Sequence, residues 1–326
     1  MAYLLAAGGL AILLVGGQAL VAGATGLARW FGLSTLVIGL TVIAFGTSLP
    51  ELLVAVQAAV RGSPGLTTGS VVGSNIANIL LILGVGALVQ PIACALHSVL
   101  RDGASLLAAT ALFTGFALTG AFRAGHGAVL LAALAFFMVW SYVGERRALQ
   151  AAGPASGLAA QPMAALAPVP SRPRRMTPLV AVILVAAGSG ALYMGSTMLI
   201  AGAVAIARSF AVPEELIGLT LIAVGTSLPE LAAALTAGLR GEADLVLGNV
   251  VGSNIFNCLA VMGAAAVAAP IPVTAEILRL DIWIMVGASL LLIPVMVVGW
   301  RVSRLEGGIL LLLYAGFLAS HYHGGA

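Results

Sequence analysis

Apolar segments about as long as a lipid bilayer is thick recur from one end of this 326-residue chain to the other. A helix needs about 20 apolar residues to cross the hydrocarbon core of a bilayer. The chain is 61% hydrophobic and only 8% charged, whereas a soluble domain is about 25% charged. So little polar surface could not cover the core of a soluble protein of this size. The chain is therefore predicted to be an all-α, multi-pass membrane protein with lipid as its main solvent.

The apolar runs, separated by charges and by Gly/Pro clusters, predict ten transmembrane helices in two groups of five. The predicted limits are 2–22, 34–60, 66–90, 103–121 and 126–144 in the first group, and 178–203, 213–239, 245–269, 281–300 and 307–322 in the second. The longest break, residues 145–177, is rich in Ala, Gly, Pro and Arg. This composition is typical of a flexible linker. We therefore predict a first five-helix repeat over 1–144, a linker over 145–177 and a second repeat over 178–326.

The arginines indicate how the chain is oriented in the membrane. All fourteen basic residues are Arg, and placing the linker in the cytoplasm puts ten of them inside. The four that fall outside are Arg61, Arg123, Arg208 and Arg279. This bias follows the positive-inside rule, and it places both termini outside the cytoplasmic membrane. The net charge of +3 is small and spread over loops, so no nucleic-acid partner is expected. No obligatory protein partner is evident.

The two halves of the chain repeat one another at a constant offset of 179 residues. Gly39–Leu52 (GLTVIAFGTSLPEL) differs from Gly218–Leu231 (GLTLIAVGTSLPEL) at only two positions. The same offset aligns Gly69–Gly84 (GSVVGSNIANILLILG) with Gly248–Gly263 (GNVVGSNIFNCLAVMG). A register this long without gaps indicates a duplicated unit.

When a repeated unit has an odd number of transmembrane helices, the first copy ends on the opposite side of the membrane from where it began. The second copy therefore starts from that opposite side and is inverted. Five predicted helices in each half therefore indicate an inverted repeat, which is the architecture of many secondary transporters, with substrate bound near the midplane. The alternative is a helical bundle duplicated only for stability. That alternative does not explain two identical polar hexapeptides inside apolar helices.

Two glutamates stand apart from the other acidic residues. The chain has eleven carboxylates, and nine of them fall in predicted loops or at helix ends. Glu51 and Glu230 lie inside apolar helices, where an ionisable group marks an ion or proton pathway by default. Pairing with a buried arginine is the structural alternative, but no Arg lies at a comparable depth. The two glutamates are therefore the primary candidates for binding an ion.

Each glutamate ends a GTSLPE motif that predicts an interruption in helix 2 or helix 7. Pro50 and Pro229 lack the backbone N–H that would bond to the carbonyls of Gly46 and Gly225, four residues earlier. Thr and Ser can hydrogen-bond backbone groups that are freed in this way. Irregular backbone at this depth occurs only where it is buried or lines a cavity. Carbonyls, hydroxyls and a carboxylate should therefore converge in each half, as all-oxygen ligands for a hard cation.

A second repeated motif, GSNIxN, adds polar side chains to the same region. Ser74 and Asn78 are four residues apart, as are Ser253 and Asn257, so each pair shares one helix face and can line one cavity. The alternative is that these side chains only join helices to one another, as small polar residues often do in membranes. We interpret the intervening Asn75 and Asn254 as structural.

On these motifs the chain resembles the calcium/cation antiporter superfamily, in its bacterial sodium/calcium exchanger family. The GTSLPE and GSNIxN pairs are similar to that family's two alpha repeats, with alpha-1 motifs over 39–84 and alpha-2 motifs over 218–263. The resemblance implies a ten-helix inverted layout in the bacterial inner membrane. It also implies alternating access, in which the first and sixth helices, here 2–22 and 178–203, move across the other eight.

The resemblance also implies roles for individual residues. Glu51 and Glu230 would be the main calcium ligands, together with the backbone carbonyls of Thr47 and Thr226. The groups that would complete the sodium sites are the hydroxyls of Ser48, Ser74, Ser227 and Ser253 and the carbonyls of Ala44 and Ala223. Asn78 and Asn257 would face the central site. Some relatives carry Asp in place of Asn257, and potassium-dependent members are associated with that acid, so this chain is expected to be independent of potassium.

Ca²⁺ and Na⁺ are the expected transported ions, and no cofactor is expected. Two ionised glutamates would be neutralised by one Ca²⁺, while Na⁺ ions could occupy the same oxygens. Because an empty site with two charges is costly to move through a low-dielectric barrier, competition for shared ligands would couple the two ions. The alternatives are a proton-coupled divalent cation exchanger and a cation channel. An intramembrane enzyme is disfavoured because no HExxH or other catalytic motif is present.

Overall fold

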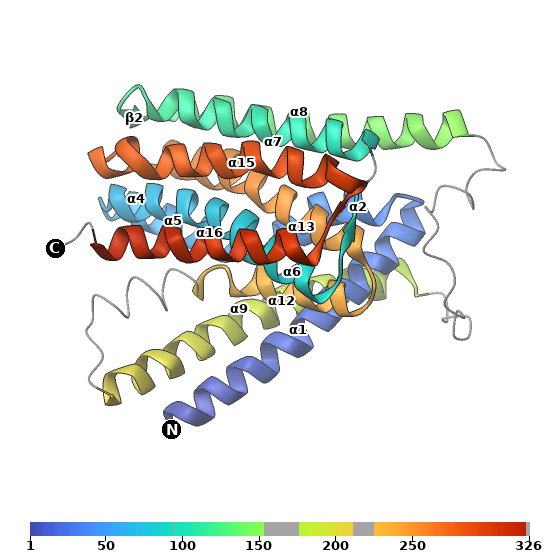
Figure 1. Ribbon diagram of the computed structural model, residues 1–326, viewed down its shortest axis with the longest axis horizontal. Coiled ribbons are helices and arrows are strands. Elements are labelled where there is room, and N and C mark those ends of the chain that lie inside the picture. The colour runs from blue at the N-terminus through green and yellow to red at the C-terminus, as the bar shows by residue number, and fades with distance from the viewer. Residues whose placement is uncertain (95, 153–175, 211–224, 324–326) are drawn as a thin grey trace.

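The computed structural model describes residues 1–94, 96–152, 176–210 and 225–323 (Figure 1). Helices make up most of these residues. The α-helices are α1 (Ala2–Phe31), α2 (Thr35–Ile38), α3 (Ala44–Thr47), α4 (Leu49–Val60), α5 (Pro64–Ala77), α6 (Leu83–Val89), α7 (Leu96–Ala117), α8 (Ala124–Ala152), α9 (Pro178–Ser209), α12 (Leu228–Leu239), α13 (Ala243–Phe256), α14 (Met262–Ala268), α15 (Ile282–Val297) and α16 (Arg304–His323).

Short π-helical, 3₁₀ and strand segments connect or interrupt these helices. The π-helices are η1 (Gly39–Ile43), η2 (Asn78–Ile82), η4 (Asn257–Val261) and η5 (Ile277–Asp281), the 3₁₀ helix is η6 (Val298–Trp300), and the two-residue strands are β1 (Ile92–Ala93), β2 (Ala121–Phe122), β3 (Ile271–Pro272) and β4 (Arg301–Val302). The π-helix η2 joins α5 to α6, and η4 joins α13 to α14, so each pair forms one continuous helix with a π-turn in its middle. A π-turn inside an α-helix is rare and frequently accompanies a functional site.

The helices include enough long apolar segments for a multi-pass membrane protein. Among the described residues, six helices are long and apolar enough to cross a membrane, and a bent pair, Thr35–Thr47 with Leu49–Val60, makes seven. The six are Ala2–Phe31, Pro64–Val89, Ala124–Arg147, Pro178–Ser209, Ala243–Ala268 and Ile277–Trp300. Residues 213–224 of the predicted 213–239 helix lie outside the described residues, and its last twelve residues form α12 (Leu228–Leu239).

The helices that carry GSNIxN form the centre of the molecule. In the most apolar window of Ala243–Ala268, 89% of the residues are buried, and in that of Pro64–Val89 78% are buried. The corresponding share is only 22% for α8, which lies at the opposite side of the molecule from α1 and α9 in Figure 1. The polar motif residues are therefore enclosed by the other helices and kept away from lipid.

The first helix of each half packs against the other along a line of glycines. A Cβ on Gly16 would lie 2.9 Å from the backbone nitrogen of Leu192, and a Cβ on Gly195 would lie 2.7 Å from that of Leu13. Such distances leave no room for any side chain. The contacts run in opposite directions along α1 and α9, so the pair is antiparallel, and it is inclined to the remaining helices (Figure 1). The glycines at this interface recur every seven residues: Gly9, Gly16 and Gly23 on α1, and Gly188, Gly195 and Gly202 on α9.

Contacts between the two halves are reciprocal. Each interface glycine of α9 lies 179 residues after one of α1. Thr110 on α7 and Ser289 on α15 are also 179 residues apart, and their hydroxyl oxygens are 3.4 Å from each other. At the helix ends, β1 pairs with β4 and β2 pairs with β3, both antiparallel. When two halves are related by a twofold axis, equivalent residues that lie near the axis contact one another. The contacts described here therefore fit a twofold relation between the halves.

Several predicted helix limits differ from the structure: α7 runs over Leu96–Ala117, not 103–121, and α9 extends to Ser209, not 203. The first helix extends to Phe31, not 22, and ends at Gly32, which adopts the left-handed conformation (φ 62°) of a helix C-cap. Gly23, directly after the predicted end, packs against α9. The predicted linker starting at 145 is also wrong over its first eight residues, because α8 continues to Ala152. Charged residues end the apolar segment there, but they do not break a helix. The rest of the linker, 153–175, lies outside the described residues.

Candidate cation-binding site

The first GTSLPE motif forms a sharp break in its helix. Helix α3 ends at Thr47 and α4 begins at Leu49, and the two parts are bent by 47°. Ser48 at the junction has φ −87° and ψ 7°, in the sparsely populated region between helix and strand. Pro50, in the first turn of α4, needs no N–H partner there. The residues of the motif thus stop one helix and start the next.

The second GTSLPE motif has the same local geometry in its described part. Helix α12 begins at Leu228, and Ser227 has φ −90° and ψ 7°, within a few degrees of Ser48. Gly225 and Ser227 are buried and Thr226 is half-buried. Residues 211–224, which include the candidate ligand Ala223, lie outside the described part of the chain.

The two motifs meet at the carboxylates. Glu51 is 2% exposed and Glu230 is 1% exposed. The hydroxyl of Ser48, in the first motif, donates to Oε1 of Glu230, in the second, over 3.1 Å. Within the described ranges neither glutamate forms an ion pair, since the salt bridges there join Arg101 to other acids. Two buried carboxylates therefore lie in a region without a compensating side-chain cation.

The GSNIxN side chains belong to the same buried region. Ser74, Asn78, Ser253 and Asn257 are each at most 4% exposed. Asn78 opens η2 and Asn257 opens η4, so the π-turns begin at equivalent positions of both motifs. The intervening Asn residues have the packing contacts expected of structural members. Asn75 donates to Sγ of Cys258 (3.3 Å), and Asn254 donates to the carbonyl of Val250 in its own helix (2.9 Å).

Many polar atoms of these candidate residues have no hydrogen-bond partner among the described residues. They are both carboxylate oxygens of Glu51, Oε2 of Glu230, the hydroxyls of Ser227 and Ser253, and both side-chain polar atoms of Asn78 and Asn257. Buried polar groups are normally paired. A set of buried oxygens with two carboxylates fits a hard cation that is bound by oxygen.

One expected backbone ligand, the Ala44 carbonyl, also serves the helix. It accepts from the backbone N–H of Ser48 (3.0 Å), and its oxygen lies 3.3 Å from the hydroxyl oxygen of Thr47. The Thr47 hydroxyl lies 3.1 Å from the carbonyl of Ile43 as well. An ion that bound the Ala44 carbonyl would thus share it with the last turn of α3.

Sequence reasoning missed Asn249, which connects the two motifs. Its Oδ1 accepts from the Thr47 hydroxyl (3.3 Å), and its Nδ2 donates to the backbone carbonyl of Glu230 (3.2 Å). Asn249 is 1% exposed and aligns with Ser70 in the first half. The sequence offered one signal for this role: Asn249 is a polar residue at a position where the two repeated segments differ. Asn249 is therefore a positioning residue that helps to hold the two halves of the site together.

Comparison with known proteins identifies the class to which this site belongs. The family model described as "Sodium/calcium exchanger protein" matches residues 1–143 and 180–322. The chain belongs to the sodium/calcium exchanger family. Both matched segments contain a GTSLPE and a GSNIxN motif, so the candidate site is formed by the two parts that define the family. The family consists of ion exchangers, and this places the chain among cation antiporters.

Individual exchangers and antiporters match along almost the whole chain. The putative antiporter CaxA of Alkalimonas amylolytica is 38% identical over 95% of both chains. The sodium/calcium exchanger MaX1 of Methanosarcina acetivorans is 31% identical, again over 95% of each. Among solved structures, the sodium-calcium exchanger NCX_Mj soaked with Na⁺ and Sr²⁺ superposes with a TM-score of 0.79 at 29% identity, covering 97% of this chain and 98% of that one. The fold is thus that of a known exchanger.

Replacing Asn249 by Leu is expected to weaken both the fold and calcium binding at the candidate site. The change leaves the Glu230 carbonyl without its side-chain donor, and an unpaired buried polar group costs about 1–3 kcal/mol. We expect a lower temperature of unfolding and a smaller stabilisation by calcium. Asn254→Leu is the matched control, because Asn254 bonds only within its own helix. Equal losses of calcium stabilisation in both variants would show that Asn249 has no specific role at the site.

Proposed function

We propose that this chain is a secondary active antiporter that exchanges Ca²⁺ for Na⁺ across the cytoplasmic membrane, with both ions competing for one central all-oxygen site. The observation that carries the proposal is the contact between Ser48 and Glu230, because it joins the two acidic motifs in one buried region. The exchanger relatives and the unpartnered oxygens around Glu51 support the same conclusion.

The charge of the site explains how exchange could be coupled. Glu51 and Glu230 supply a charge of −2 when both are ionised. One Ca²⁺ neutralises this charge, and Na⁺ ions can occupy the same carboxylate, hydroxyl and carbonyl oxygens. An isolated charge in a low-dielectric interior carries a large desolvation penalty. The protein can therefore change from its outward-open to its inward-open state when the site holds Ca²⁺ or Na⁺, but not when the site is empty. Because the two ions compete for the site, each Ca²⁺ carried in one direction requires Na⁺ to be carried back in the other.

The α1–α9 pair is the proposed moving part. Ser189 of α9 packs against Gly46, with 3.5 Å between its Cβ and a Cβ built on that glycine, and Ile200 packs against Gly225. The same helix thus touches both GTSLPE motifs. Because glycines hold α1 and α9 together along their length, the two helices can slide as one unit over the motifs and expose the site to either side in turn.

The proposed layout has ten helices in two inverted five-helix repeats, with both termini outside. The antiparallel packing of α1 against α9 and the contact between Thr110 and Ser289 support the inverted relation. The roles proposed for the ligands are those implied by the alpha repeats, with the Ala223 and Thr226 carbonyls supplying the second half's backbone oxygens.

The test is radiolabelled calcium uptake into vesicles that contain the purified protein. An outward sodium gradient should drive uptake, and an outward proton gradient of the same size should not. Uptake should saturate with calcium, as expected for a carrier. Uptake driven by protons without sodium would replace the proposal with proton-coupled exchange. Single-channel currents would replace it with a pore.

A further inference from the structure

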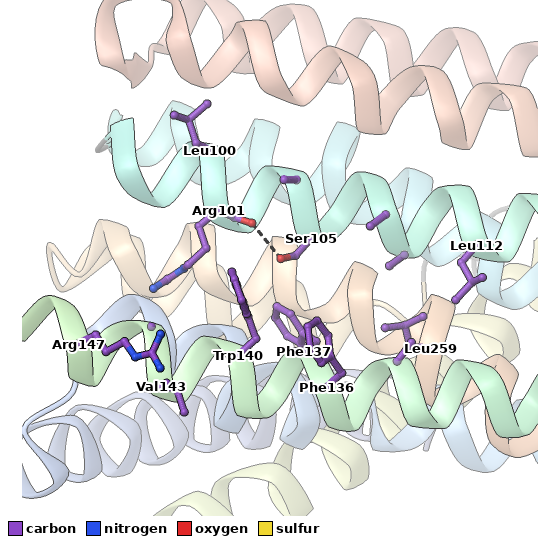
Figure 2. A pocket seen from close by; sticks show the side chains of 15 residues that line it. Leu100, Arg101, Ser105, Leu112, Phe136, Phe137, Trp140, Val143, Arg147 and Leu259 are labelled. Atoms are coloured by element: carbon purple, nitrogen blue, oxygen red, sulfur yellow. Dashed lines mark hydrogen bonds between the residues drawn. The ribbon is translucent and has the colours of Figure 1, made fainter.

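A groove between α7 and α8 is separate from the cation site (Figure 2). Its volume is about 890 Å³, and its walls are mostly apolar. Ala104 and Ala108, one helical turn apart on α7, leave it open, and Phe136 and Trp140 of α8 line it from the other side. None of the described residues that line it belongs to GTSLPE or GSNIxN.

The groove has the length of one membrane leaflet. Along α7 its lining runs from Leu100 to Leu112, which at about 1.5 Å per residue is ~18 Å. Half of the hydrocarbon core of a bilayer is ~15 Å. An apolar groove of this length on an outer helix pair of a membrane protein matches an acyl chain, with Leu112 near the bilayer centre and Arg101 near the headgroups.

The headgroup end of the groove is basic. Arg101 from α7 and Arg147 from α8 lie at this same end (Figure 2). Arg101 is held by two acids, with Nε 2.7 Å from Oδ1 of Asp102 and Nη1 3.5 Å from Oε2 of Glu145. The other oxygen of Glu145 accepts the backbone N–H of Ser34 (3.0 Å). Both acids are therefore already engaged.

Arg147 has no such acid. It is exposed and forms no ion pair with any residue that the structure describes. The neighbouring Arg146 is exposed as well and lies over the ring of Tyr142, 5.5 Å from its centroid. Together with Trp140, which is 55% exposed, these side chains have the character of a membrane interface, where Trp and Tyr are enriched. The mouth of the groove thus carries an excess of positive charge.

We propose that the groove binds an anionic phospholipid, with the lipid phosphate on Arg147 and an acyl chain along Ala104 and Ala108 towards Leu259. A guanidinium group binds phosphate through two parallel hydrogen bonds. Basic pockets between transmembrane helices are suited to anionic headgroups for this reason. The proposal depends on the chain lying in a membrane and does not depend on which ions it exchanges.

The inner end of the groove brings the lipid close to the cation site. Leu259 lines the groove and lies in η4, two residues after Asn257. An acyl chain seated there packs against the π-turn that begins at this asparagine. The lipid would therefore fill a space beside the most buried helix of the exchanger.

The experiment measures lipid that stays bound to the purified protein. The chain is reconstituted in vesicles of phosphatidylglycerol and phosphatidylethanolamine, extracted in mild detergent and weighed with its lipids by native mass spectrometry. The wild type should retain phosphatidylglycerol in preference to phosphatidylethanolamine. Arg147→Gln should reduce this preference about fivefold, the factor for one arginine near an anionic headgroup. Arg123→Gln, at the other end of α8 and also exposed, is the matched control.

A second pair of variants tests the apolar part of the groove. Ala108→Phe fills it and should lower retention of both lipids, whereas Ala132→Phe, at an exposed position of α8 outside the lining, should not. An Arg147→Gln variant that keeps the wild-type lipid preference overturns the proposal, as does a folded Ala108→Phe variant with full retention. If Ala108→Phe fails to fold, Arg147→Gln decides alone, because its exposed side chain is not needed for packing.

Discussion

Sodium-driven calcium uptake is expected to be lost when either Glu51 or Glu230 is replaced by Gln. Glutamine keeps the shape of the side chain but removes one of the two charges that bind the cation. Removing one partner of a buried charge interaction costs about 2–5 kcal/mol, which lowers calcium affinity by about 30-fold or more. Uptake by vesicles at micromolar calcium should fall to the level of vesicles without protein.

The same variants should remain folded. Both carboxylates are buried without a cationic side chain nearby among the described residues, so neutralising one removes a desolvation penalty. In the absence of calcium, the temperature of unfolding should equal or exceed that of the wild type. Calcium raises that temperature by binding the folded state, and this increase should disappear. The exposed Glu276 provides the control Glu276→Gln. Wild-type uptake by either site variant would remove the acidic pair from the mechanism.

Replacing Gly188 by Leu is expected to be among the most damaging changes outside the cation site. A Cβ at this position would lie 2.5 Å from the backbone nitrogen of Leu20 and 2.9 Å from the carbonyl oxygen of Gly16. Backbone atoms cannot move aside as a flexible side chain can, so α1 and α9 must separate. Overpacking costs about 1–3 kcal/mol even in adaptable cores. We expect a lower temperature of unfolding and at least a tenfold loss of exchange.

Gly190 supplies the matched control on the same helix. It lies two residues further along α9, and a Cβ there would meet nothing within 4 Å. Gly190→Leu should therefore leave both unfolding and exchange close to the wild type. If Gly188→Leu exchanged calcium at the wild-type rate, close packing of α1 on α9 would be unnecessary for transport, and the proposal that the pair moves as one unit would fail.

The sequence alone was sufficient to predict the residues of the candidate site. Glu51 and Glu230 were identifiable because a carboxylate is rare inside an apolar helix, and the constant offset of 179 residues identified their partners. Pro50 indicated the break between α3 and α4, since a missing N–H acts locally and needs no knowledge of the fold. Membrane insertion followed from composition, because the solvent of each segment is determined by its own side chains.

Only the tertiary structure decided which groups from distant segments meet. The hydrogen bonds from Ser48 to Glu230, from Thr47 to Asn249 and from Asn249 to Glu230 join residues on separate helices, and no local pattern specifies such pairs. That the glycines of α1 form its contact with α9 also became visible only in the structure. The π-turns at Asn78 and Asn257 also had no sequence signal. The physical reason is that propensity and polarity act within one segment, whereas packing distances and hydrogen-bond partners depend on how the segments are arranged in space.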